Sequence, residues 1–142
     1  MMEKHLRLTS GIIFSPFSKG LLTMATTLTL HMDEGGSYVI NIATTDEDGD
    51  AKAPKTLNWT LTTRDGQTVI NDRKEVDIPS PTASEDVVLN DADCAILSGE
   101  TASQVLRLFT VKGTYDSTLG NDLNLRAQCY IPLDNYPALP IS

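Results

Sequence analysis

The feature that most constrains the fold of this chain is a strict alternation of apolar and polar residues around its single tryptophan. Leu57, Trp59 and Leu61 alternate with Asn58 and Thr60. Successive side chains of a β-strand point to opposite faces, so this pattern predicts a strand with the tryptophan on its buried face. Burying a tryptophan removes ~150–250 Å² from water, a gross gain of about 4–6 kcal/mol at roughly 25 cal/mol per Å². We therefore expect Trp59 at the centre of a hydrophobic core.

The residues that follow this strand predict a tight reversal of the chain. Arg64 is followed by Asp65-Gly66, a pair that readily supplies the positive φ angles of a hairpin turn. The apolar pair at the end of Gln67–Ile70 then predicts the start of a return strand.

Similar alternation recurs along the chain and is interrupted by glycine, proline and acidic turn signals. One short acidic segment, 90–97, predicts a single helical turn capped by Asn90 or Asp91. The segment 103–115 is apolar on both faces, which predicts a central position in a sheet. The expected strands are 26–32, 38–43, 56–63, 67–70, 75–78, 86–89, 103–115 and 123–133.

This pattern predicts an all-β fold, because no amphipathic helix exceeds two turns. Short strands separated by frequent turns, with tryptophan on the third, favour an immunoglobulin-like β-sandwich of seven or eight antiparallel strands. A jelly roll or small barrel is the alternative. The cysteine pair that usually flanks the tryptophan is absent, so no disulfide is expected. Cys94 and Cys129 are interpreted as free thiols, which fits a reducing cytoplasm.

The charge of the chain argues against several classes of partner. The formal net charge is −8 over 142 residues. Residues 1–23 carry three basic residues against one acidic residue, a net charge of +2, which leaves −10 for the remainder. Nucleic-acid phosphates are bound by clustered Lys and Arg, so we expect no nucleic-acid partner. No apolar run approaches the ~18 residues of a membrane span, so we expect no membrane partner either.

The sequence predicts one domain between two irregular ends. Residues 1–23 show no strand or helix periodicity, and they precede Met24, which resembles a natural start of translation. The segment 1–23 is therefore expected to be a flexible arm or a mis-assigned upstream start. We expect the β-sandwich domain over 24–133 and a proline-containing tail over 134–142.

No motif for catalysis or for a cofactor is present. The chain has two histidines, His5 in the irregular arm and His31, which alternates outward on its predicted strand. Nucleophilic catalysis needs a histidine beside a serine or thiol, and zinc needs several soft ligands at a recognised spacing. Gly35-Gly36 lies between two strands and precedes no helix, so it is no phosphate loop. We expect no catalytic, cofactor-binding or metal-binding residues, and no enzyme.

The acidic segment 46–50 invites comparison with a calcium loop, because carboxylates at alternate positions suit calcium. An EF-hand loop requires glycine at its sixth position and glutamate at its twelfth. Here Gly49 is fourth and Leu57 is twelfth, counted from Asp46. A solvated loop is therefore the favoured interpretation.

The C-terminal tail contains the candidate partner-binding residues. Tyr136, Leu139 and Ile141 are separated by Pro137 and Pro140. A segment of this length cannot form a core by itself, so it is either a disordered tail or an arm that docks on a neighbouring molecule. Both interpretations stay open at this point.

Several of these segments together resemble a group of small immunoglobulin-like proteins encoded among the virion structural genes of tailed bacteriophages and prophages. The resemblance covers Met24 to Leu133. The matching segments are 57–61 with Asp65-Gly66, 87–89 before the acidic turn, 108–111, 113–117 and 120–126.

The resemblance implies a non-enzymatic virion protein: a capsid decoration, neck, tail or baseplate component. Its expected partners are other virion proteins, with the chain forming a homo-oligomer or a lattice. Its expected location is the virion, assembled in the bacterial cytoplasm. The alternative is a free cytoplasmic immunoglobulin-like domain that binds a carbohydrate or a protein.

Overall fold

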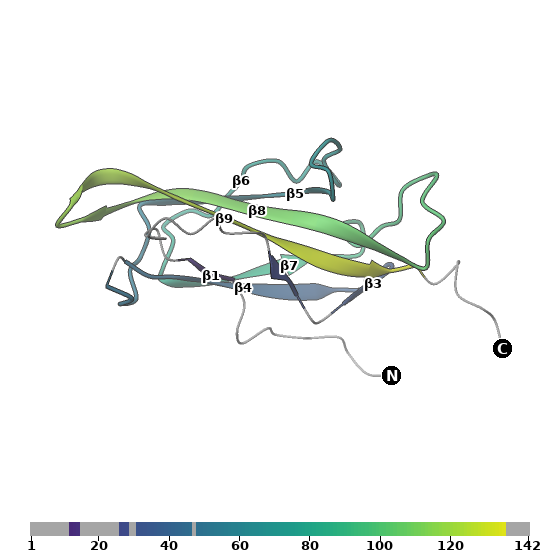
Figure 1. The fold of residues 1–142 in the computed structure, drawn as a ribbon, viewed down its shortest axis with the longest axis horizontal. Helices are drawn as coiled ribbons and strands as arrows, with labels where there is room; N and C mark the ends of the chain where they lie inside the picture. The colour runs from purple at the N-terminus through teal and green to yellow at the C-terminus, as the bar shows by residue number, and fades with distance from the viewer. Residues whose placement is uncertain (1–11, 15–25, 29–30, 47, 136–142) are drawn as a thin grey trace.

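The computed structural model describes residues 12–14, 26–28, 31–46 and 48–135. Within these residues the fold is all-β, with no helix and no disulfide. Figure 1 shows two layers of strands, with the long β8–β9 hairpin running along the molecule above the layer that contains β4. The strands are β1 Ile12–Phe14, β2 Thr26–Thr27, β3 Met32–Asp33, β4 Tyr38–Thr44, β5 Thr56–Thr63, β6 Val76–Asp77, β7 Ser84–Leu89, β8 Gln104–Ser117 and β9 Gly120–Asp134.

The larger sheet is mixed and curled. Its strands follow the order β2-β9-β8-β5-β6, and β3 also pairs with β9. The contacts of β5 with β6 and β8, and of β8 with β9, are antiparallel, whereas β2 and β3 run parallel to β9. The central position predicted for 103–115 is confirmed, because β8 lies between β5 and β9.

The smaller sheet has the order β1-β4-β7. β4 and β7 form a six-residue antiparallel pairing, from Tyr38 opposite Leu89 to Ala43 opposite Ser84. β1 joins the other edge of β4 in parallel, with Ile12 opposite Ile42. This strand lies within the segment 1–23 that the sequence places outside the domain, and the domain boundaries stay a prediction.

The core lies between the inward faces of the two sheets. Trp59 is 5% exposed, and its ring stacks on Phe109 with centroids 5.5 Å apart. Leu57 and Leu61 are fully buried beside it, as the alternation predicts. The remaining buried apolar residues include Met32, Tyr38, Ile40, Ile42, Ile70, Val87, Leu89, Cys94, Val111, Tyr115, Leu125, Cys129, Ile131 and Leu133.

Gly113 allows the central strands to approach closely. It lies opposite Leu57 on β5, and a Cβ atom at this position would overlap the carbonyl oxygen of Thr56. No side chain fits there, so the β5–β8 pairing at this end of the sheet requires glycine.

Two predicted strands differ from the observed ones. The continuous strand expected over 26–32 is replaced by β2 and β3, and residues 29–30 lie outside the described residues. The return strand expected over 67–70 is reduced to an isolated bridge between Thr62 and Val69. Asn71 and Asp72 follow with φ of 50° and 56°, and these left-handed conformations interrupt the pairing, although the Arg73 carbonyl still accepts from the Leu61 N–H on β5 at 2.9 Å.

The helical turn predicted over 90–97 is confirmed in part, because a single hydrogen-bonded turn forms at residues 90–94 and does not extend to residue 97. The Cys94 N–H donates to the Asn90 carbonyl at 3.2 Å, and no helix continues from it. The expected cap was the side chain of Asn90 or Asp91. Instead the Asn90 backbone N–H donates to the Asp93 carboxylate at 2.8 Å. Apolar burial of Cys94 and Ile96 outweighs local helix signals here.

Candidate interaction surfaces

The one histidine among the described residues has no catalytic surroundings. His31 is 43% exposed, as its outward alternation predicts, and its Nδ1 lies 3.2 Å from a carboxylate oxygen of Asp134. Its other described neighbour is the Gln104 amide, at 3.4 Å. Neither neighbour supplies the hydroxyl or thiol that a histidine base would activate. His5 lies outside the described residues.

Both cysteines are free and buried, as predicted for their oxidation state. The Cys94 side chain is fully buried within its turn, and its thiol lies 3.7 Å from the Met32 sulfur. Burial raises the pKa of Cys94 to about 12, and it raises the pKa of Cys129 to about 12 as well. Thiols in these surroundings are poor nucleophiles.

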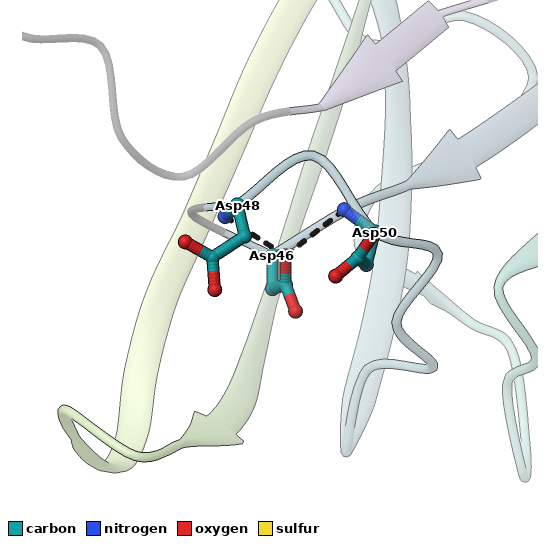
Figure 2. Close-up of side chains that lie close together, drawn as sticks. All are labelled: Asp46, Asp48 and Asp50. Atoms are coloured by element: carbon teal, nitrogen blue, oxygen red, sulfur yellow. Dashed lines mark hydrogen bonds between the residues drawn. The ribbon is translucent and has the colours of Figure 1, made fainter.

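The acidic loop brings three carboxylates together. Figure 2 shows Asp46, Asp48 and Asp50 around one bend of the chain, and one oxygen from each lies within 4.8 Å of the others. Asp46 Oδ1 accepts hydrogen bonds from the backbone N–H of Asp48 at 2.9 Å and of Asp50 at 3.0 Å. These bonds, together with a φ of 84° at Gly49, account for the bend without an ion.

Three aspartates would supply only part of a calcium shell, which takes six to eight oxygens. Asp48 and Asp50 are exposed, and among the described residues no further carboxylate joins the cluster. The geometry therefore shows a hydrogen-bonded acidic turn and gives no reason to assign a metal.

An open groove lies on the outward-facing side of the larger sheet. Its volume is about 940 Å³. Leu106 on β8 and Tyr130 on β9 form an apolar part of its floor, and Gln104 extends the floor toward the end of the sheet. Each is at a position that faces away from the core, because their sequence neighbours Val105, Arg107 and Ile131 alternate inward. The groove is therefore a surface feature with an apolar base.

One wall of the groove is the turn after β5. Its lining includes Thr63, Arg64, Asp65 and Thr68. The Asp65 carboxylate accepts from the Thr63 hydroxyl at 2.6 Å and from the Gln67 N–H at 3.0 Å. The Thr63 hydroxyl bond, aided by the Gln67 N–H, lowers the pKa of Asp65. The wall thus has a defined conformation, and it presents both a cation and an anion.

The opposite wall is the loop 97–100, which is attached to the core by a buried cation. Arg107 is fully buried and donates to both carboxylate oxygens of Glu100, at 2.7 and 2.8 Å, and to the Ala95 carbonyl at 3.0 Å. Glu100 also accepts from the Leu97 N–H at 2.8 Å. The Arg107 guanidinium holds the pKa of Glu100 below its usual range. This two-point pairing fixes the loop against the sheet.

The end of β9 lies against the same loop. Asn135 is 3% exposed, and its side-chain amide donates to the carbonyls of Glu100 and Ala102 at 3.3 and 3.1 Å. Its backbone N–H donates to Ser103 at 2.8 Å. The chain therefore passes residue 135 next to the groove wall. Tyr136, Leu139 and Ile141, the predicted partner-binding residues, lie outside the described residues.

The sheet edges are a second kind of candidate surface. β7 is the end strand of the smaller sheet, with β4 on one side and no described strand on the other. Val88 on this strand is 59% exposed. An edge of this kind can accept an extended segment of another chain.

The groove could not be predicted from the sequence. Its walls and floor come from four separate segments around residues 64, 98, 105 and 130. The sequence contained one signal of the groove: Leu106 and Leu108 are apolar, although they lie on the face of β8 that does not carry Phe109.

The described residues contain no helix that is both long enough and apolar enough to cross a membrane. Comparisons of the chain with models of protein families, with curated proteins and with solved structures found no match.

Proposed function

We propose that this chain is a non-enzymatic structural or interaction protein of a tailed-phage virion, built on an immunoglobulin-like sandwich. In this role it binds other virion proteins as a capsid decoration, neck, tail or baseplate component. Its copies associate as a homo-oligomer or lattice. The arrangement of its strands is the observation that carries this proposal.

The strand pairing supports the immunoglobulin-like assignment. If β2 and β3 together count as a first strand, then the second and fifth strands, β4 and β7, pair in one sheet. The third, sixth and seventh strands, β5, β8 and β9, are neighbours in the other sheet. Immunoglobulin-like sandwiches divide their strands in this way and place a tryptophan on the third, where Trp59 lies. Two departures are that the first strand pairs in parallel with the last, and that the fourth, β6, pairs with the third instead of joining the sheet of β4 and β7.

The surfaces support binding rather than catalysis. Among the described residues, the exposed histidine has no nucleophile beside it, and both thiols are buried. The open edge at β7 and the groove beside Tyr130 are instead suited to extended segments of other proteins. The excess of acidic residues opposes contact with nucleic acid.

Counting copies of this chain in purified particles tests the proposal. Quantitative mass spectrometry would compare it with the major capsid protein in particles from its source. Virion parts occupy symmetric rings or lattices, so we expect a reproducible integral stoichiometry. Hundreds of copies would indicate a capsid decoration or a tail-tube subunit, and a few to several dozen would indicate a neck or baseplate ring. Absence from particles would overturn the virion assignment.

A free cytoplasmic binding domain is the second candidate. The groove favours it, because Tyr130 on the floor and Arg64 and Asp65 on one wall combine an aromatic surface with hydrogen-bonding groups. Such a combination suits a carbohydrate or a peptide. Saturable binding of a soluble saccharide, measured by calorimetry and lost in Tyr130→Ala, would favour this function over the virion role.

A further inference from the structure

We propose that the groove on the larger sheet binds the C-terminal segment Tyr136–Ile141 of a second copy of this chain. This proposal rests on the virion function, in which copies of the chain associate, and it names the partner of one surface of the chain. It assigns the docking role of Tyr136, Leu139 and Ile141 to a specific place on the neighbouring copy.

The chemistry of the groove matches that of the segment. Leu97, Leu106 and Tyr130 provide apolar contacts, and Arg64 and Gln104 provide side-chain donors. A proline-spaced segment presents apolar side chains together with carbonyls that have no partner within the segment. In polyproline II geometry, Tyr136 and Leu139 are one turn apart, about 9 Å, on the same side. Aromatic-lined grooves with polar rims recognise extended segments of this kind.

The position of residue 135 favours a second copy over the same chain. Asn135 is fixed beside Glu100 and Ser103, at the wall of its own groove. Residues before proline are biased toward extended backbone, which applies to Tyr136 and Leu139, and each proline fixes its own φ near −65°. A reversal within the first residues after Asn135 is therefore unfavourable. An extended segment of six residues reaches about 19 Å, enough to contact a neighbour.

The groove needs little rearrangement to receive this segment. One wall is held by the Asp65 turn, and the other by the ion pair between Arg107 and Glu100. Binding to a preformed site avoids the cost of ordering its walls. A single contact of this size is weak, and repetition in a ring or lattice strengthens it. Because segment and groove are different surfaces, the contact is head-to-tail, which generates rings or filaments.

Two variants separate the halves of this contact. Leu139→Asp with Ile141→Asp removes the apolar anchors of the segment but keeps the groove. Leu106→Lys places a charge on the groove floor but keeps the segment. Leu119→Lys, an equally exposed apolar residue in the turn between β8 and β9, is the matched control. Circular dichroism and thermal melting confirm that each variant is folded.

Sedimentation velocity of the full chain over roughly 0.01–1 mM measures the association. We expect wild type and Leu119→Lys to form concentration-dependent oligomers. Each of the other two variants should associate at least about tenfold more weakly, as loss of a central anchor does. An equimolar mixture of those two variants keeps one intact contact, so we expect a one-to-one heterodimer and no larger species.

Three outcomes overturn the proposal: a wild-type chain that stays monomeric at the highest concentration, segment variants that associate like wild type, or a mixture that forms no heterodimer. If Leu106→Lys does not fold, Arg64→Glu on the groove wall takes its place with the same expectations. These outcomes are measured on the purified chain and are independent of its copy number in particles. Failure of this contact is therefore distinguishable from failure of the virion function.

Discussion

At the scale of single residues, the least expected feature is an arginine in the core. Arg107 occupies an inward position of β8, in line with Phe109 and Val111, and it is fully buried. Its partner Glu100 keeps 21% of its side chain exposed. Removing one member of a buried ion pair lowers the free energy of unfolding most when the charge that remains cannot be hydrated. The two substitutions are therefore not equivalent.

Glu100→Ala should lower the free energy of unfolding by about 3–5 kcal/mol, because it leaves the buried guanidinium without its counter-charge. Arg107→Met should cost at least about 1 kcal/mol less, because the remaining carboxylate can be hydrated and the new side chain fills an apolar site. Urea unfolding of both variants at neutral pH provides the measurement. A larger loss for Arg107→Met than for Glu100→Ala would contradict this account.

Asp93 gives the stability a defined pH dependence. Its side chain is fully buried; burial raises its pKa, and hydrogen bonds from Arg73, Asn71 and the Asn90 N–H outweigh that effect, so the net pKa is lowered. A carboxyl whose folded pKa is below its unfolded value, about 3.9, stabilises the fold above that pH. This contribution is lost as the pH falls through the folded pKa.

We therefore expect Asp93→Asn to lower the free energy of unfolding by about 1–3 kcal/mol at pH 7, because it weakens the contact with Arg73. The difference from wild type should shrink as the pH is lowered below about 4. Urea unfolding at a series of pH values measures it. Asp48→Asn, on an exposed loop, is the control, and its difference from wild type should stay within a few tenths of a kcal/mol over the same pH range.

At the scale of strands, the alternation of side chains predicted most of the sheet. β4, β5, β7, β8 and β9 lie where the period-two pattern places them. The pattern does not encode strand direction, so it could not show that β2 and β3 run parallel to β9. It also misled at Ile70, which is buried although the chain there makes only one bridge to β5. An apolar residue that is buried outside a strand gives the same signal in the sequence as one that is buried within a strand.

Substituting Gly113 tests the close approach of β5 and β8. Gly113→Ala should lower the free energy of unfolding by about 1–3 kcal/mol, because the added Cβ overlaps the Thr56 carbonyl and the strands must separate. Thermal melting of this variant, with the exposed neighbour Lys112→Ala as control, measures the effect. Equal melting temperatures for the two variants would mean that the strands are not so close.

The acidic loop also makes a prediction that distinguishes a solvated turn from a calcium site. In calcium-free buffer Asp48→Asn should raise the free energy of unfolding by a few tenths of a kcal/mol, because it removes repulsion between clustered carboxylates. For a solvated turn, millimolar calcium should leave the wild-type melting temperature unchanged to within about 1 °C. A larger rise that Asp48→Asn abolishes would establish calcium binding instead.

At the scale of the whole molecule, the two sheets depend on one shared core. Cys94 lies in a turn after β7, and Cys129 lies on β9, yet both belong to the same buried cluster. Reagents can reach these thiols only when the structure opens around them. Thiol reactivity therefore reports the opening of the fold around each cysteine.

In the native protein at pH 8, we expect both thiols to react with a disulfide reagent at least ~100-fold more slowly than in denaturant. Their pKa values, raised by burial to about 12, further reduce the thiolate population. Rapid reaction of one thiol, followed by mass spectrometry, would identify a local opening around that residue. Equal rates in the native and unfolded chains would contradict the buried positions.

The parallel pairing of β2 and β3 with β9 has a mechanical consequence. Thr26 lies opposite Cys129 and Asp33 opposite Asp134, and both partner strands run in the same direction. A pulling force that draws the start of β2 away from the end of β9 makes the strands slide past each other. All the hydrogen bonds between them then bear the load together, instead of breaking one after another as in an unzipped hairpin. A subunit linked to its neighbours through these two regions would resist stretching.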